Sequence, residues 1–139
     1  MIDAPAWRAG PPSMIPVVAE DPAAPSALPT PDSWAWFAET GKSRAPSWKN
    51  EVTLRSVEMF TEYEPGSYAS FISPTPLLMV VALGDVLTVA DLALAAYETA
   101  LEPKRLVTLS GAHFDAYVKD FDSASKPAVE WFSQHLASK

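Results

Sequence analysis

Cysteine is absent from the chain. Its absence excludes disulfide bonds, thiolate catalysis and cysteine-ligated zinc. Basic charge is also scarce, because 10 Lys and Arg stand against 17 Asp and Glu, which gives a net charge of -7. Binding to nucleic acid requires clustered cations, and here the basic residues are scattered. The charge balance therefore argues against a nucleic-acid partner.

Long hydrophobic runs are missing as well. The longest, Leu77 to Leu83, is far shorter than the roughly 18 apolar residues that a membrane span needs. Residues 1–5 show no basic region leading into an apolar stretch, so we expect no signal peptide. The last three residues match no peroxisomal or retention signal. We expect a soluble, cytoplasmic protein without a membrane partner.

Proline, by contrast, is abundant in the first half of the chain. Of the 14 prolines, 12 lie at or before Pro76. They exclude a long helix or a central strand from residues 1–30, which we predict to be irregular, with disorder as the alternative. The apolar stretch Met14–Val18 is a candidate for an additional strand. We predict a Pro-rich segment over residues 1–30, a helical, cap-like region over 31–72 and an α/β unit over 73–139.

Helices are predicted between the prolines of the middle region. One begins with Asp32 and Ser33 as its cap, and a second runs from Glu51 to about Tyr63 with Asn50 as its cap. A short helical turn is expected over Ser67–Ile72. The first of these helices carries three aromatic side chains, at Trp34, Trp36 and Phe37.

Two strands are predicted in the last part of the chain. Residues Leu77–Ala82 form an unbroken apolar run, which is typical of a strand buried on both faces, and Arg105–Leu109 is a second candidate. A helix over Val89–Leu101 separates them. Two strands joined by a crossover helix are parallel, with a right-handed connection. The sequence thus predicts an α/β fold with parallel strands and crossover helices.

The predicted helix starts rest on polar residues. Thr88, with Asp91 three residues later, resembles a capping box. Ser123 is predicted to cap a final helix that runs to about Leu136. We expect that helix to bury one apolar side, formed by Val129, Trp131, Phe132 and Leu136.

Asp85 and His113 each follow one of the predicted strands. Because parallel strands end at the same edge of a sheet, their loops should lie together, where open α/β sheets place their sites. A carboxylate beside an imidazole fixes its tautomer, and a neutral imidazole can accept and return a proton. The alternatives are a turn-forming Asp and an ordinary structural His. The paired placement at one edge favours the catalytic interpretation.

Two segments carry a resemblance to a known family. Residues 73–85, Ser-Pro-Thr-Pro-Leu-Leu-Met-Val-Val-Ala-Leu-Gly-Asp, and residues 110–114, Ser-Gly-Ala-His-Phe, resemble the acid and histidine loops at the C-terminal end of the α/β-hydrolase superfamily. With Glu102–Arg105 and Phe114–Tyr117, they are most similar to the dienelactone-hydrolase-like set that includes fungal polyketide transferases and secondary-metabolite hydrolases.

This resemblance implies a function. Asp85 and His113 would be the acid and base of a Ser-His-Asp triad acting on a small ester, thioester or acyl substrate, with no cofactor and no metal. The region Pro29–Phe71 resembles an insertion that covers the active site. Within it Trp34, Trp36 and Phe37 are candidate substrate contacts, although ordinary packing is the favoured alternative.

One element of the triad is missing from the pattern. None of the five glycines brackets a serine as G-x-S-x-G, and Ser110 shares its loop with His113 instead of sitting on a strand-to-helix elbow. Whether the chain alone is an enzyme therefore stays open. We expect either self-association or pairing with a separate N-terminal half. The alternative is a non-catalytic, truncated fragment or an accessory, binding subunit.

Carboxylates that could bind a cation follow His113. Asp115, Asp120 and Asp122 form an acidic stretch after His113. Their spacing matches no calcium-binding loop, so a solvated helix start is the favoured interpretation.

Overall fold

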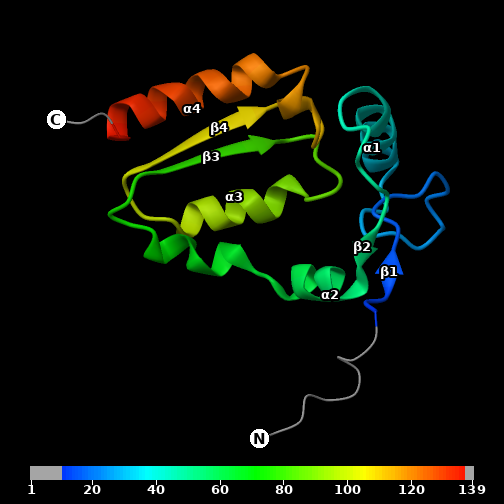
Figure 1. The fold of residues 1–139 in the computed structure, drawn as a ribbon. Coiled ribbons are helices and arrows are strands. Elements are labelled where there is room, and N and C mark those ends of the chain that lie inside the picture. Colours follow the sequence, from blue (N-terminus) through cyan, green and yellow to red (C-terminus); the bar gives the residue numbers. More distant parts are fainter. Residues whose placement is uncertain (1–10, 137–139) are drawn as a thin grey trace, which may run out of the picture. The chain divides into compact units, whose positions relative to one another are not determined.

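The computed structural model describes residues 11–136, which divide into two compact units (Figure 1). The first extends through Tyr63 and the second begins at Glu64. None of the helices in this range combines the length and apolar character needed to cross a membrane. The predicted irregular or disordered character of residues 1–10 falls outside the described residues.

The second unit is built on two parallel strands. Strand β3 spans Leu77–Ala82 and β4 spans Lys104–Leu109, in a register that pairs Leu77 with Lys104 and Ala82 with Leu109. Helix α3, Ala90–Thr99, connects them, and helix α4, Phe121–Leu136, follows β4. In Figure 1 the two helices flank the strands on opposite sides. The predicted α/β fold with parallel strands and crossover helices is confirmed.

The core of this unit gathers between the strands and helices. Val81 and Leu109 are buried from the strands, Ala90 and Ala100 from the ends of α3, and Trp131 from α4. The predicted apolar side of α4 is otherwise wrong, because Val129, Phe132 and Leu136 are exposed. Two strands offer a narrow surface, which covers Trp131 but not a full helical stripe.

Both helix starts in this unit differ from the prediction. Helix α3 begins at Ala90 with Val89 as its N-cap and no capping side chain, so the predicted capping box at Thr88 is wrong. Helix α4 begins at Phe121, which places Ser123 inside it. A short 3₁₀ helix, Asp115–Tyr117, leads into α4, and the Asp120 backbone N–H donates to the Asp115 carbonyl at 2.8 Å. The chain therefore turns into α4 before Ser123 is reached.

The first unit holds a small antiparallel sheet. Strand β1, Met14–Ile15, pairs with β2, Val52–Thr53. The apolar stretch Met14–Val18 therefore does pair as a strand, but not in the parallel sheet. Val18, the last residue of this stretch, is 1% exposed. Its backbone N–H and carbonyl are both hydrogen-bonded to the Asn50 side chain.

The helices of the first unit lie near their predicted positions. Helix α1 spans Pro31–Ser43 with Thr30, rather than Asp32 or Ser33, at its N-cap. Helix α2 spans Leu54–Glu62, where the Thr53 side chain accepts a hydrogen bond from the Ser56 backbone. Asn50 is not its cap, because residues 52–53 form a strand first. In the second unit, a 3₁₀ helix over Pro65–Phe71 confirms the predicted turn.

Candidate active site

Asp85 and His113 meet where the two parallel strands end. The hydrogen bonds between the strands continue beyond the end of β3. The Leu83 N–H donates to the Leu109 carbonyl at 2.8 Å, and the Gly84 N–H donates to the Gly111 carbonyl at 3.0 Å. The two loops are thus joined by backbone bonds directly before the functional side chains. The strand register carries both residues to one place.

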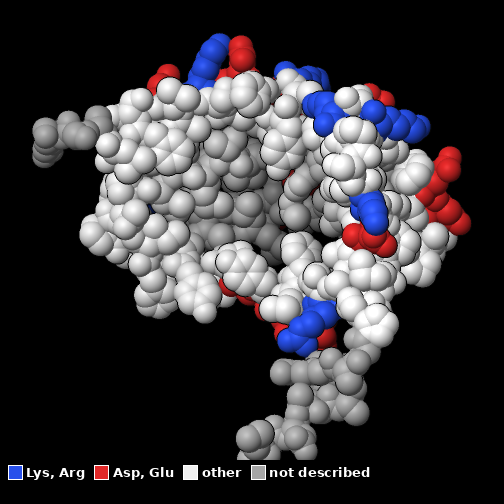
Figure 2. Space-filling view, viewed as in Figure 1, with Lys and Arg blue, Asp and Glu red and all other residues white. Residues whose placement is uncertain are grey.

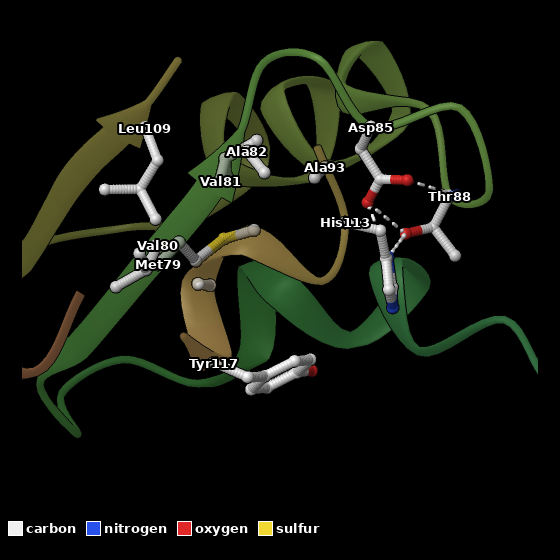
Figure 3. Close-up of a pocket in the computed structure, with 11 residues that line it drawn as sticks. Met79, Val80, Val81, Ala82, Asp85, Thr88, Ala93, Leu109, His113 and Tyr117 are labelled. Atoms are coloured by element: carbon white, nitrogen blue, oxygen red, sulfur yellow. Dashed lines mark hydrogen bonds and ion pairs between the residues drawn. The ribbon is translucent and has the colours of Figure 1, made fainter. Parts of the chain in front are cut away.

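The imidazole and the carboxylate form a short contact. His113 Nδ1 lies 2.7 Å from Asp85 Oδ2 (Figure 3). The His113 side chain is 24% exposed and the Asp85 side chain 10%. Within residues 11–136, His113 Nε2 has no hydrogen-bond partner. An imidazole that donates from Nδ1 to a carboxylate presents Nε2 as a proton acceptor, which is the arrangement a general base requires.

The Asp85 carboxylate is held in its ionised form. Its Oδ1 accepts from the backbone N–H groups of Leu87 at 2.9 Å and Thr88 at 2.8 Å, and its Oδ2 accepts from the Thr88 hydroxyl at 2.8 Å. Burial raises the pKa of Asp85, but the bonds from Thr88, His113 and Leu87 together outweigh it, and the pKa lies below 3.8. Asp85 can therefore stabilise an imidazolium at neutral pH.

Two aromatic rings from the following segment pack near the imidazole. The ring centroids of Phe114 and His113 are 4.6 Å apart in an edge-to-face arrangement, and Tyr117 lies 6.5 Å away. Both rings therefore contribute an aromatic, apolar environment next to the imidazole.

A cavity of about 270 Å³ opens beside these residues. Asp85, Thr88 and His113 lie at one end, and the remainder is lined by apolar side chains of the second unit (Figure 3). These are Met79, Val80, Val81, Ala82, Ala93, Leu109, Ala116 and Tyr117. The cavity places an apolar surface next to a proton acceptor.

Comparison with known proteins identifies the fold. No protein-family model and no curated protein sequence matches the chain. Among solved structures, an α/β hydrolase, GrgF from Penicillium sp. sh18, matches with a TM-score of 0.72 and 22% identity over 95% of this chain and 45% of its own. The chain has the α/β-hydrolase fold. DcsB, solved in complex with its substrate analogue, matches with a TM-score of 0.74 and 18% identity over 95% of this chain and 46% of its own.

The match covers nearly all of this chain but only part of each matching protein. The chain spans about half the length of GrgF and DcsB, while nearly all of its own length is covered. The predicted α/β-hydrolase fold is confirmed. The dienelactone-hydrolase-like subgroup stays a prediction.

The predicted aromatic contacts belong to the other unit. Trp34, Trp36 and Phe37 lie on α1 and are half-buried. Phe37 packs on Trp48 with ring centroids 5.3 Å apart, and the Arg44 guanidinium lies 5.0 Å from the Trp36 ring. These contacts account for the two rings by local packing, and a role in substrate binding stays a prediction.

Two residues of the acidic stretch after His113, Asp115 and Asp122, take part in hydrogen bonds or ion pairs. Asp115 accepts from the Ala112 backbone N–H at 2.9 Å, and that bond lowers the pKa of Asp115. Its carboxylate also lies 3.4 Å from Lys119, and that of Asp122 lies 3.4 Å from Lys126. Across the part of the chain that the structure describes, no group of three or more potential ligands is placed to hold a metal ion.

Thr88 is the site residue that the sequence did not assign to the site. It lies three residues after Asp85, at a spacing where a side-chain carboxylate and a following backbone N–H and hydroxyl meet in a turn. The same spacing from Thr88 to Asp91 suggested a helix cap. The two patterns compete for one hydroxyl, and Asp85 is its partner in the structure.

Proposed function

We propose that this chain supplies the acid and the base of an acyl-transfer site, as an ester or thioester hydrolase or an acyltransferase. The observation that carries the proposal is the 2.7 Å contact between His113 Nδ1 and Asp85 Oδ2, with Nε2 left to face a reacting group. The α/β-hydrolase fold supports it, because the acid and the base follow late strands in that fold, in the order found here.

In the proposed reaction His113 acts twice. Nε2 takes the proton of a serine hydroxyl as its oxygen forms a bond to the acyl carbon, and Asp85 stabilises the imidazolium. The bond from the acyl carbon to the leaving group then breaks, and the proton passes from Nε2 to that group. Water or an acceptor alcohol repeats the cycle and releases the acyl group.

The serine is proposed to come from another polypeptide segment. No G-x-S-x-G pattern occurs in the 139 residues, and Ser110 is in the histidine loop. The apolar lining of the cavity supports an apolar acyl group as the substrate. The sequence resemblance to fungal polyketide transferases and secondary-metabolite hydrolases supports a place in fungal secondary metabolism, including polyketide chemistry, and one of the structural matches is an α/β hydrolase from the fungus Penicillium sp. sh18.

The test compares p-nitrophenyl ester hydrolysis by two preparations. One is the purified chain alone, and the other is the chain isolated without denaturation together with the segment that supplies the serine. We expect turnover in the native preparation that is lost in His113→Ala and kept in His135→Ala, which removes the only other histidine. Equal turnover in His113→Ala and the wild type would contradict the proposal. Turnover by the chain alone that disappears in Ser110→Ala would place the nucleophile within this chain.

A second candidate is an accessory or binding subunit, and the edge of β3 favours it. The Leu77 N–H donates to the carbonyl of Pro103, directly before β4, and the Leu83 N–H donates to the carbonyl of Leu109, the last residue of β4. Because alternate residues of a strand point the same way, the N–H groups of Leu78, Val80 and Ala82 face the opposite edge. In the described residues the sheet has only β3 and β4, so this edge lacks a neighbouring strand.

Other features of the second unit are also suited to a protein partner. The face of the second unit seen in Figure 2 carries few charged side chains. Several large apolar side chains of this unit are exposed, namely Phe71, Leu92, Leu101, Val129, Phe132 and Leu136. An uncovered sheet edge and exposed apolar side chains both promote pairing with another chain.

Pairing of this kind, either self-association or pairing with an N-terminal half, is measurable by analytical ultracentrifugation. We expect the purified chain to sediment as a dimer or larger species, or to unfold over a broad thermal range. A monodisperse monomer with a sharp thermal transition would contradict the pairing.

A further inference from the structure

The Thr88 hydroxyl occupies the corner between the acid and the base. It donates to Asp85 Oδ2 at 2.8 Å and lies 3.3 Å from His113 Nδ1, while Oδ2 and Nδ1 are 2.7 Å apart. In Figure 3 the three side chains point toward one another. An Nδ1–H that donates to Oδ2 therefore has the Thr88 oxygen as a second, weaker acceptor.

The two oxygens of Asp85 are held by different groups. Oδ1 is held by the backbone N–H groups of Leu87 and Thr88. Oδ2, the oxygen that faces His113, is held by side chains, those of Thr88 and His113. A carboxylate fixed at one oxygen can still swing its other oxygen, so the Thr88 hydroxyl is the group that holds Oδ2 when the imidazole moves.

No other role in the structure accounts for this hydroxyl. Helix α3 begins two residues later, and no side chain caps it. Thr88 is exposed, so burial in the core does not explain a threonine here either. Within the described residues, the hydrogen bonds of the Thr88 hydroxyl are made only with Asp85 and His113.

We propose that Thr88 is a positioning residue, whose hydroxyl fixes Asp85 Oδ2 and thereby holds His113 in the tautomer with the proton on Nδ1. The proposal rests on the proposed function, in which Nε2 must be the proton acceptor. Without the hydroxyl, Oδ2 would sample other orientations, and the imidazole would populate both tautomers.

The experiment measures the tautomer directly by ¹⁵N NMR of the imidazoles, above the pH range in which histidine titrates. The chain has two histidines, and His135→Gln assigns the signals of His113. We expect nitrogen shifts of the Nδ1–H tautomer for His113 in the wild type, and averaged shifts in Thr88→Val, which has the same shape without the hydroxyl. Thr88→Ser should restore the wild-type shifts.

The outcomes separate this proposal from the proposed function. A folded Thr88→Val variant with wild-type nitrogen shifts would overturn the role of Thr88. Asp85→Asn is the reference, because a neutral amide attracts the Nδ1 proton less than a carboxylate does and its NH₂ group can donate to Nδ1 instead. If Asp85→Asn leaves the shifts unchanged as well, the acid and base pair itself fails. In the native assembly, Thr88→Val should lower ester turnover about tenfold, the effect of one lost hydrogen bond, and Thr88→Ser should recover it.

Discussion

The backbone N–H of Gly84 donates to the carbonyl of Gly111 at 3.0 Å, and this bond joins the loop of the acid to the loop of the base. No side chain takes part in it. None of the glycines in residues 11–136 has a positive φ, so Gly84 is needed here for the close approach and not for its backbone conformation. The spacing between Asp85 and His113 is therefore set by main-chain geometry one and two residues before them.

Gly84→Ala should separate these loops. A Cβ atom at Gly84 would lie 2.9 Å from the Gly111 carbonyl oxygen, and a backbone atom cannot move aside as a flexible side chain can. We expect the free energy of unfolding to fall by about 1–3 kcal/mol, as for other overpacked sites. Urea denaturation measures this loss, and the ¹⁵N shifts of His113 should report a broken contact with Asp85.

Gly66→Ala is the matched control for Gly84→Ala. A Cβ atom there would meet the Glu64 carboxylate at 3.1 Å, at the end of a side chain that can rotate away. We expect little change in unfolding free energy. Equal losses in both variants would mean that the close approach at Gly84 is not what limits stability.

The pKa of Asp85 gives the stability a defined pH dependence. Burial raises this pKa, and the hydrogen bonds from Thr88, His113 and Leu87 lower it below 3.8 in the folded chain. A carboxyl with a depressed pKa contributes stability in full above its unfolded value, and the contribution is lost as the pH falls through the folded value. The gap in unfolding free energy between wild type and Asp85→Asn should thus be constant at neutral pH and shrink below about 3.8.

Asp122→Asn serves as the control for this pH series. The Asp122 carboxylate is exposed and pairs with Lys126 on the same helix. Surface pairs of this kind contribute about 0–1 kcal/mol. If the difference in unfolding free energy between wild type and Asp85→Asn stayed the same below the pH range in which carboxyls titrate, the assigned cause would be contradicted.

The elements that hold the site were predictable because their signals are local. The unbroken apolar run of Leu77–Ala82 identified β3, and the order of strand, helix and strand required parallel pairing, which places Asp85 beside His113. The helix starts were not predictable, because Thr88 can serve either a helix or Asp85. Spacing alone cannot show which partner an hydroxyl takes.

The remaining differences come from contacts between distant residues. Asn50 resembles a helix cap in the sequence, but it binds Val18, which lies 32 residues away. The buried side of α4 was overestimated because apolar spacing shows which residues can be buried, while the width of the sheet decides how many are. The extent of the sheet is not readable from the helix itself.

Asn50→Ala should destabilise the first unit. The Asn50 amide accepts from the Val18 N–H at 3.0 Å and donates to the Val18 carbonyl at 2.8 Å, at a residue that is 1% exposed. Leaving these two backbone groups unpaired should cost about 1–3 kcal/mol. Thermal unfolding measures the loss. Lys49→Ala, which removes an exposed pair with Glu51, should leave the transition in place.

Lys104→Met should loosen the end of α3. Lys104 Nζ donates to the Tyr97 carbonyl at 2.8 Å and lies 4.5 Å from the centre of the Tyr97 ring. A cation at a helix C-terminus contributes about 0.3–1 kcal/mol, and its contact with the ring adds a similar amount. Amide hydrogen exchange in the last turn of α3 should become faster. Lys126→Met on α4 is the control. Equally fast exchange in the last turn of α3 in this control would contradict the assignment to Lys104.

The parallel register of β3 and β4 has a consequence for how this chain tolerates insertions and deletions. Because side chains alternate along a strand, gaining or losing one residue in either strand would shift one loop by about 3.3 Å and turn its side chains to the other face. Helix α3 lies between the strands in sequence, but neither Asp85 nor His113 belongs to it. We therefore expect homologous chains to vary in the length of the α3 connection while keeping the number of residues from each strand to its functional side chain.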